Sequence, residues 1–306
     1  MKILVTGGAG FIGSWMAAKL ADNAQNQIVI VDNLLTGRTE NIPTSKHNNV
    51  KFIKADVNDF KDISSIFHSY SFDYVFHYAA VVGVQRTLQH PSWVLNDLTG
   101  LKNVLNLSKN TGVKQIYYSS SSEVYGEPVE YPQNEHTTPL NSRLPYAIVK
   151  NVGEAYLRAY KQEYDLDFTI FRFFNTYGPG QSTDFVMSKF LNAALKNNDI
   201  TIYGDGMQTR TFCFILDNIE ACYNAFDKKL FVNDVVNIGN DIETSVLELA
   251  QTIIKLTGSK SNIVHLPPLN EGDMTRRQPD ITKMHDLLQR PLASLENGIK
   301  LLMKMP

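Results

Sequence analysis

Cysteine is scarce in this sequence, because the 306 residues contain only Cys213 and Cys222. Both stand in otherwise apolar stretches, and two cysteines make no disulfide framework. They are therefore expected to be small core residues in a reducing compartment, which favours the cytoplasm. An excess of one charge sign is also lacking, since the formal net charge is −2. A balanced charge predicts no broad attraction to nucleic acid or to an anionic membrane.

Long apolar runs are lacking as well. No stretch reaches the roughly 18 apolar residues of a membrane span, and the opening MKILVTGG is too short an apolar run for a signal peptide. Internal repeats, low-complexity tracts and a set of metal ligands are not found. What is present is 43% hydrophobic and 20% charged residues, which is typical of a soluble protein with a sizeable core.

Short apolar runs alternate with helical patterns in the first 180 residues. The runs predict strands at 2–6, 28–31, 51–53, 74–78, 115–118 and 168–173. Helical spacing predicts helices at 11–24, 60–69, 93–109 and 146–164. Because strands that are apolar throughout are buried on both faces, we expect a Rossmann-type, doubly wound parallel sheet over residues 1–180.

The rhythm changes after Pro179. The pattern predicts helices at 186–196, 217–227 and 245–257, and short strands at 200–203, 234–237 and 262–265. A loop rich in Pro, Arg and Asp follows at 267–280. Residues 181–306 are therefore expected to form a smaller α/β lobe that binds the substrate, with some segments crossing back to the large sheet.

The sequence TGGAGFIG at residues 6–13 follows the first strand and opens the first helix. Gly7 suits a tight turn, Gly10 allows a pyrophosphate to approach the backbone, and Gly13 allows the helix to pack close to the strand. The helix N-terminus offers free N–H groups to phosphate oxygens. A glycine triplet alone is weak evidence, but here it has the strand and helix that a dinucleotide site requires.

Asp32 ends the second predicted strand, where a carboxylate can accept hydrogen bonds from the ribose hydroxyls of adenosine. A 2′-phosphate there would meet a like charge, so Asp32 favours NAD over NADP, although nearby Arg38 weakens this argument.

Tyr146 and Lys150 are four residues apart at the start of a predicted helix, so both side chains share one face. A free tyrosine titrates near pH ~10, and a nearby ammonium together with the positive nicotinamide of NAD⁺ favours its phenolate. Such a phenolate can act as a base at neutral pH. An ordinary exposed pair has the same spacing. The serines in SSSSEVYG at 119–126 favour the functional interpretation, because they follow a strand where open α/β sheets bind ligands.

Together these motifs resemble the extended short-chain dehydrogenase/reductase superfamily, in its nucleotide-sugar branch. That branch includes UDP-galactose 4-epimerases, dTDP-glucose 4,6-dehydratases and UDP-glucuronate decarboxylases. The resemblance covers essentially the whole chain. It comprises, in order, TGGAGFIG, VDNLLTG, KADVND, HYAA, SSSSEVYG, YAIVK, FRFFNTYGPGQ, YGDGMQTRTF and RRQPDITK.

The resemblance implies a role for individual residues. Tyr146 is expected to be the catalytic base, with Lys150 as its partner, and Ser121 to bind the 4-hydroxyl of the sugar. The residues expected to contact NAD are Gly7, Gly10, Phe11, Ile12, Gly13, Asp32, Asn33, Asp56, Val57, Ala79, Ala80, Tyr146, Lys150 and Phe173. The sugar diphosphate is expected on Asn175, Arg210 and Arg277, since arginine forks suit phosphate oxygens.

All three chemistries of the branch begin with oxidation of the sugar at C4. Dehydratases carry Thr-Asp-Glu before VYG, whereas this chain has Ser121, Ser122 and Glu123 and lacks the acid. Glu123, a further catalytic candidate, is a mark against simple 4-epimerases. Decarboxylases carry Ser-Glu there, but they have a longer insert before the tyrosine and an arginine where Asn151 stands. A 4-dehydrogenase that releases the keto-sugar also fits.

Two other classes of function would leave different features in the sequence. A non-catalytic NAD-binding regulator would be favoured by loss of Tyr146 or Lys150, and an RNA-binding relative by a basic groove; the sequence shows neither. Family members commonly form homodimers through a four-helix bundle, and the matching helices here are 97–110 and 146–164. Within the first of these, the apolar residues Leu101, Val104, Leu105 and Leu107 also suit packing on the sheet.

Overall fold

A seven-stranded parallel sheet dominates the computed structural model, which describes residues 1–268 and 276–305. Its strand order is β11-β6-β5-β4-β1-β2-β3, and every neighbouring pair is parallel. The strands are β1 (Lys2–Thr6), β2 (Gln27–Asp32), β3 (Val50–Lys54), β4 (Tyr74–His77), β5 (Gln115–Ser121), β6 (Asp167–Phe173) and β11 (Asp234–Ile238). The predicted Rossmann-type sheet is confirmed.

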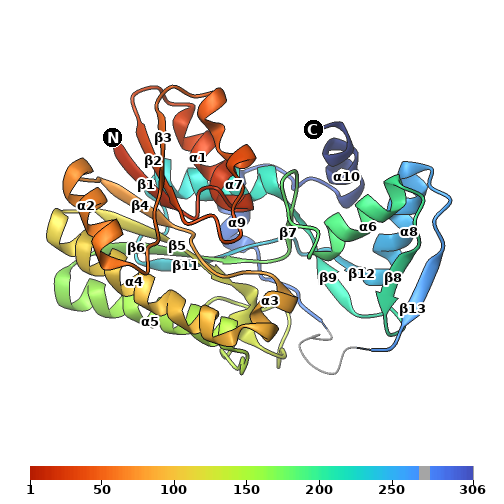
Figure 1. Cartoon of the computed structure of the whole chain (residues 1–306). Coiled ribbons are helices and arrows are strands. Elements are labelled where there is room, and N and C mark those ends of the chain that lie inside the picture. Colours follow the sequence, from red (N-terminus) through yellow and green to blue (C-terminus); the bar gives the residue numbers. More distant parts are fainter. Residues whose placement is uncertain (269–275, 306) are drawn as a thin grey trace.

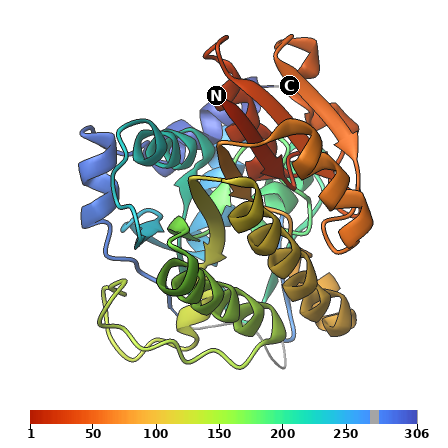
Figure 2. The same ribbon diagram turned by 90° about the vertical axis from the view of Figure 1, so that its left-hand side faces the viewer.

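Helices cover both faces of this sheet, as Figures 1 and 2 show. One face carries α2 (Phe60–Tyr70), α4 (Pro91–Thr111) and α5 (Pro145–Tyr164), and the other carries α1 (Phe11–Ala21), α7 (Ile215–Asp227) and α9 (Thr282–Leu288). Along β2, Ile28 and Ile30 belong to one apolar core, whereas Val29 and Val31 belong to the other. Burial on both sides is why the strands read as continuous apolar runs.

The smaller lobe lies on the right of Figure 1. It contains α6 (Val186–Leu195), α8 (Val246–Thr257) and α10 (Leu295–Lys304). Strand β8 (Ile200–Tyr203) pairs in parallel with β13 (Ile263–Leu266), and β9 (Thr209–Thr211) pairs antiparallel with β12 (Glu243–Ser245). A further short parallel pair is β7 (Thr176–Tyr177) with β10 (Cys213–Phe214).

Two later segments cross back to the large sheet. β11 pairs with β6, and the apolar face of α7 joins the core that also contains α1. The division of the chain near residue 180 stays a prediction. The sequence analysis did not predict α9, α10 or α3 (Val84–Gln89), nor the short helical turns η1 (Thr39–Asn41), η2 (Pro43–Ser45) and η3 (Ser122–Tyr125). The predicted loop at 267–280 lies partly outside the described residues.

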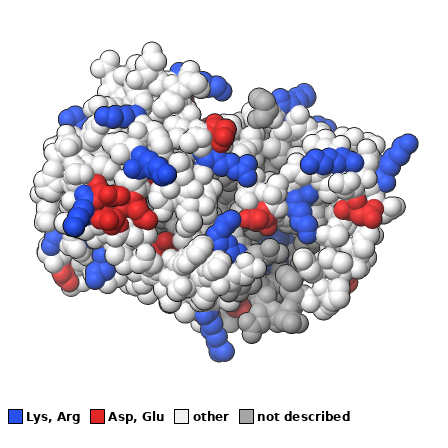
Figure 3. Space-filling view, in the orientation of Figure 1, with Lys and Arg blue, Asp and Glu red and all other residues white. Residues whose placement is uncertain are grey.

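The four leucine and valine residues that sequence analysis considered for a dimer interface lie in the core of the single chain. Leu101, Val104, Leu105 and Leu107 are all buried beside α5 and the sheet. Across residues 1–268 and 276–305, no helix combines the length and apolar character that crossing a membrane requires. On the face shown in Figure 3, basic and acidic side chains are interspersed.

Candidate functional site

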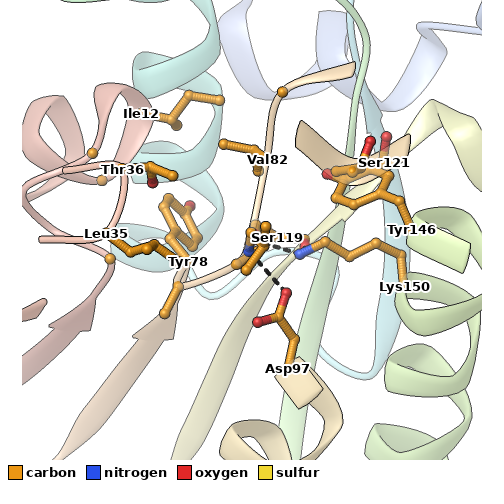
Figure 4. Close-up of a pocket in the computed structure, with 18 of the residues that line it drawn as sticks. Ile12, Leu35, Thr36, Tyr78, Val82, Asp97, Ser119, Ser121, Tyr146 and Lys150 are labelled. Atoms are coloured by element: carbon orange, nitrogen blue, oxygen red, sulfur yellow. Dashed lines mark hydrogen bonds between the residues drawn. The ribbon is translucent and has the colours of Figure 1, made fainter. Parts of the chain in front are cut away.

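A cavity of about 700 Å³ opens at the carboxyl ends of the central strands. Figure 4 shows part of its wall, where side chains from β5, α4 and α5 converge. The predicted site residues that line it are Gly7, Gly10, Phe11, Ile12, Gly13, Asp32, Asn33, Asp56, Val57, Ala79, Ala80, Ser121, Glu123, Tyr146, Lys150, Phe173, Asn175 and Arg277. Of all the site residues predicted from the sequence, only Arg210 does not line this cavity.

The glycine-rich turn between β1 and α1 forms one end of the cavity. Gly7 has a φ of +69°, in the left-handed region that favours glycine, and a Cβ atom there would lie 2.6 Å from the Ala79 nitrogen. A Cβ atom on Gly13 would lie 2.3 Å from the Gly7 carbonyl oxygen. These contacts leave no room for a side chain, so the first turn of α1 packs directly on the backbone of the turn that follows β1.

Asp32 stands beside this turn at the end of β2. Its carboxylate accepts hydrogen bonds from the backbone nitrogens of Ala9, at 3.0 Å, and Leu34, at 2.8 Å. Burial raises the pKa of Asp32, and the two backbone hydrogen bonds oppose that rise. Asp32 thus holds the glycine turn and the chain after β2 together while it faces the cavity.

Asn33 and Asp56 join the next part of the wall. The Asn33 amide donates to the Asp56 carboxylate at 3.0 Å, and Asp56 accepts a second hydrogen bond from the Asn58 nitrogen at 2.8 Å. These contacts connect the ends of β2 and β3. The polar surface that they create lies next to Val57 in the cavity wall.

Tyr146, in the first turn of α5, meets the end of β5. Its hydroxyl and the Ser121 side chain face one another in Figure 4. Burial raises the pKa of the Tyr146 phenol, the negative charge of Glu123 adds to the rise, and Ser121 and Arg277 oppose it. The net shift of the Tyr146 pKa is therefore upward, because burial has the largest effect. The sequence had predicted that Lys150 and NAD⁺ would lower this pKa.

Lys150 lies one turn further along α5 and is almost fully buried. Its Nζ donates to the Ser119 carbonyl oxygen at 2.6 Å and lies 5.8 Å from the centre of the Tyr146 ring. Burial lowers the pKa of Lys150 to about 8, and the charge of Asp97 opposes the shift. The ammonium is thus held on the strand end, on the same helix face as the phenol.

Asp97, on α4, is a wall residue that sequence analysis missed. Its carboxylate accepts a hydrogen bond from the Val81 nitrogen at 2.8 Å and lies below Lys150 in Figure 4. Burial raises the pKa of Asp97 to about 6, while that hydrogen bond and the charge of Lys150 act in the opposite direction. The available signal was its spacing, because Asp97 shares the apolar helix face of Leu101 and Val104.

Glu123 and Arg277 form an ion pair at the same end of the cavity. The Arg277 Nη2 lies 2.7 Å from the Glu123 Oε1, and its Nη1 donates to the Ser122 hydroxyl at 3.3 Å. Arg277 lies in the segment that precedes α9. This segment therefore places a positive charge at the end of β5.

Asn175 and Arg210, which the resemblance placed on the substrate diphosphate, lie in different surroundings. Asn175 has a left-handed φ of +31°, lines the cavity, and has a buried Nδ2 with no hydrogen-bond acceptor in the described structure. Arg210 lies on β9, where its guanidinium donates to the Thr209 carbonyl at 2.7 Å. In the part of the chain that the structure describes, no group of three acidic, histidine or cysteine side chains is placed to hold a metal ion.

Comparison with known proteins identifies the family. A model described as the NAD dependent epimerase/dehydratase family matches residues 3–239. A putative UDP-glucose 4-epimerase of Methanocaldococcus jannaschii is 36% identical over 97% of this chain and 96% of its own. A UDP-N-acetyl-α-D-glucosaminuronate decarboxylase of Bacillus cytotoxicus is 34% identical over 98% of this chain and 95% of its own.

The fold is shared along the whole chain. The crystal structure of a UDP-glucose 4-epimerase from Thermotoga maritima, with UDP-glucose, superposes with a TM-score of 0.93 at 33% identity. The match covers 99% of this chain and 98% of that one. The family match, the full-length relatives and the wall of the cavity agree. The chain belongs to the NAD dependent epimerase/dehydratase family.

Proposed function

We propose that this protein oxidises the sugar of a nucleotide-sugar at C4, with NAD as cofactor and Tyr146 as the base. One observation carries the proposal: the Tyr146 hydroxyl, the Ser121 hydroxyl and the Lys150 ammonium share one cavity with the glycine-rich turn. The family is named for epimerases and dehydratases, and the relatives of this chain include a decarboxylase. In the enzymes that the sequence resembles, these reactions begin with oxidation at C4.

The residues at the glycine end of the cavity fit a dinucleotide. The left-handed Gly7 and the closely packed Gly13 leave the N-terminus of α1 facing the cavity, where its N–H groups can bind phosphate oxygens. Asp32 offers its carboxylate to the adenosine ribose, Asp56 and Val57 flank the adenine, and Ala79, Ala80 and Phe173 form the rest of the wall. NAD bound there supplies the hydride acceptor for the sugar.

The residues at the other end fit the sugar and its phosphates. Ser121 is proposed to hold the hydroxyl that Tyr146 deprotonates, since the two side chains face one another in the cavity. The buried Asn175 amide has a donor to offer to a diphosphate oxygen, and Arg277 brings a guanidinium into the same cavity. Arg210 is proposed as the second phosphate arginine, from β9 at the edge of the smaller lobe.

The proton chemistry falls to Tyr146 and Lys150. The buried ammonium of Lys150 stabilises the Tyr146 phenolate, and this phenolate takes the proton of the sugar hydroxyl and becomes a neutral phenol. Because the pKa of Tyr146 is raised, its phenolate is a stronger base than an ordinary tyrosine phenolate. The neutral phenol can return the proton to the keto oxygen when the sugar is reduced again.

The residues beside Tyr146 favour some of the reactions that can follow C4 oxidation over others. Dehydration needs an acid to protonate the leaving hydroxyl, and position 122 is a serine whose hydroxyl contacts Arg277. Glu123 is paired with the same arginine, so its carboxylate is already engaged. We therefore favour epimerisation, decarboxylation or release of the 4-keto sugar over dehydration.

A panel of nucleotide-sugars, incubated with the protein and NAD, tests the proposal. Mass spectrometry and anomeric NMR separate the outcomes: loss of water means dehydration, loss of CO₂ decarboxylation, loss of two hydrogens dehydrogenation, and an inverted C4 at unchanged mass epimerisation. If no sugar of the panel were changed while NAD still bound, the protein would be a non-catalytic NAD-binding regulator instead.

Assembly and location remain proposals of the same kind. We propose a homodimer through α4 and α5, which pack against one another on one face of the sheet. Light scattering after gel filtration measures the mass and decides between monomer and dimer. A cytoplasmic location is proposed from Cys213 and Cys222, which are free thiols buried in the core.

A further inference from the structure

A row of polar side chains crosses the apolar sheet directly beneath the cavity. Ser120 on β5 stands in register with Arg172 on β6, which in turn stands in register with Asn237 on β11. Their exposed fractions are 2%, 1% and 0%. Burying polar groups to this degree costs much free energy unless each group has a hydrogen-bond partner, so partners are expected for all three side chains.

Glu154 on α5 supplies the partner of Arg172. The Arg172 Nε lies 2.9 Å from the Glu154 Oε1 and the Nη2 lies 2.7 Å from the Oε2, which is a two-pronged ion pair with Glu154 fully buried. The Ser120 hydroxyl donates to the same carboxylate at 2.7 Å. Because Tyr146, Lys150 and Glu154 recur every four residues, the pair is anchored to the helix face that carries the proposed base.

The third guanidinium nitrogen of Arg172, Nη1, connects the ion pair to η3. Its Nη1 donates to the Tyr125 hydroxyl at 2.8 Å, and Tyr125 in turn donates to the Asn237 side-chain oxygen at 2.8 Å. Tyr125 ends the short turn that begins at Ser122 and contains Glu123. The position of Glu123 is therefore tied to the same buried guanidinium.

Asn237 extends the connections to the segment that carries Arg277. The Asn237 amide donates to the Gln133 carbonyl at 2.9 Å. The Gln133 nitrogen donates to the Gln278 carbonyl at 2.7 Å, and the Asp280 nitrogen donates to the Gln133 carbonyl at 2.8 Å. A continuous set of hydrogen bonds thus runs from Glu154 on α5 to the residue that follows Arg277.

We propose that the buried Glu154–Arg172 ion pair is a positioning device that holds together the four segments that carry the site. These segments are α5, the end of β5, η3 and residues 277–280; the inference rests on the proposed function. Apolar packing between α5 and the sheet has no direction, whereas a forked pair fixes both distance and orientation. Buried pairs of this kind often add no stability over apolar residues of similar size, so positioning is the role that accounts for it here.

The double variant Glu154→Met with Arg172→Met tests the inference, because it removes both buried charges at once. The matched control is Arg158→Met. Arg158 lies at the surface, with its guanidinium 3.3 Å from the same Glu154 carboxylate. This control therefore removes a guanidinium next to the buried pair and leaves the pair itself intact. For each protein we would measure the melting temperature, the NAD dissociation constant, and kcat and KM for a nucleotide-sugar that the wild type converts.

The double variant is expected to melt at or above the wild-type temperature and to lose about 10- to 100-fold in kcat, since small misplacements of reacting groups have effects of that size. KM and NAD affinity should change by less than about twofold. Arg158→Met should match the wild type in all four measurements. A double variant with wild-type kcat would overturn the inference.

A readout that needs no turnover keeps failure of the inference separate from failure of the proposed function. NMR of ¹³C-methylated lysines, with the Lys150 signal assigned by Lys150→Arg, follows the pKa of Lys150, which is about 8 in the wild type. A net-neutral pair acts on this pKa much less than a single charge does, whereas movement of α5 would expose Lys150; the pKa of Lys150 should therefore rise toward its ordinary value if α5 moves. If the double variant does not fold, Ser120→Ala removes a single hydrogen bond of the pair and should lower kcat while the melting temperature stays within a few degrees. An unchanged kcat in Ser120→Ala together with an unchanged Lys150 pKa would sink the idea.

Discussion

The Glu123 carboxylate and the Arg277 guanidinium lie 2.7 Å apart although 154 residues separate them in the chain. One comes from the turn after β5 and the other from the segment before α9. Their pairing brings a positive charge to the end of the cavity where Tyr146 stands, and that charge partly offsets the effect of Glu123 on the pKa of the phenol. The two residues thus contribute to both the shape and the charge of the proposed sugar site.

Changing Arg277 to Ala should weaken binding of the nucleotide-sugar. The expected loss is about 1.5–3 kcal/mol for each charged hydrogen bond removed. NAD affinity should survive, because the glycine turn and Asp32 lie at the other end of the cavity. Calorimetry with each ligand measures both values. Arg210→Ala is the comparison: an equal loss would support a second phosphate arginine, and no loss would leave Arg277 alone in that role. Equal loss of both ligands in Arg277→Ala would indicate misfolding instead.

Changing Tyr146 to Phe should leave folding and NAD binding intact, because the ring is kept and only the hydroxyl is removed. The rate of C4 oxidation should fall by a factor of about 10²–10⁴, the usual contribution of a positioned acid–base group. Steady-state kinetics and a thermal melt on the same preparation give the two results. Turnover at the wild-type rate would end the proposed mechanism.

Changing Lys150 to Ala should slow the reaction and move its pH–rate profile to higher pH. The sign follows from the charge: the ammonium favours the phenolate, so its removal raises the pKa of Tyr146 and a more alkaline solution is needed to ionise the base. The profile of kcat/KM across neutral and alkaline pH measures the shift. A profile that moved to lower pH would show that Lys150 does not act on the phenol through its charge.

The buried Lys150 should also make the stability of the protein depend on pH. Its pKa is lowered from 10.5 to about 8 in the folded chain, so between these values the unfolded chain binds more protons and the free energy of unfolding rises with pH. Lys150→Met lacks this cost of burying a charge. Its stability relative to the wild type should therefore be highest near pH 7 and decline by roughly 3 kcal/mol toward pH ~10. Urea unfolding of both proteins at several pH values tests this, and a constant difference would contradict it.

Changing Asp32 to Asn should relax the choice between NAD and NADP. The amide offers one acceptor oxygen, whereas the two carboxylate oxygens of Asp32 accept separately from Ala9 and Leu34, so one of these hydrogen bonds is lost and a thermal melt must show that the variant stays folded. Loss of the negative charge removes the repulsion of a 2′-phosphate, and NADP should gain affinity relative to NAD. Calorimetry on cofactor-stripped wild type and variant gives the ratio. If the wild type already bound NADP as tightly as NAD, our interpretation of Asp32 would be wrong.

Local sequence determined much of the fold and half of the site. The alternation of apolar strands and helical patterns predicted six strands of the large sheet and their parallel arrangement, because period and length are properties of short segments. The turn around Gly7 and Gly13 and the helix pair Tyr146 and Lys150 were found for the same reason. In each case the residues that act together lie within a few positions of one another, and their geometry follows from one turn or one helix.

The tertiary structure alone decided the contacts between distant segments. Nothing local in the sequence places Arg277 on Glu123, Asp97 beneath Lys150, or Arg172 between Glu154 and Tyr125. These pairings depend on the order of the strands in the sheet and on the return of β11 beside β6. The sequence thus specified the elements and the residues of the nucleotide turn. The charges that surround the proposed base were decided by packing, because only packing determines which distant side chains share a buried volume.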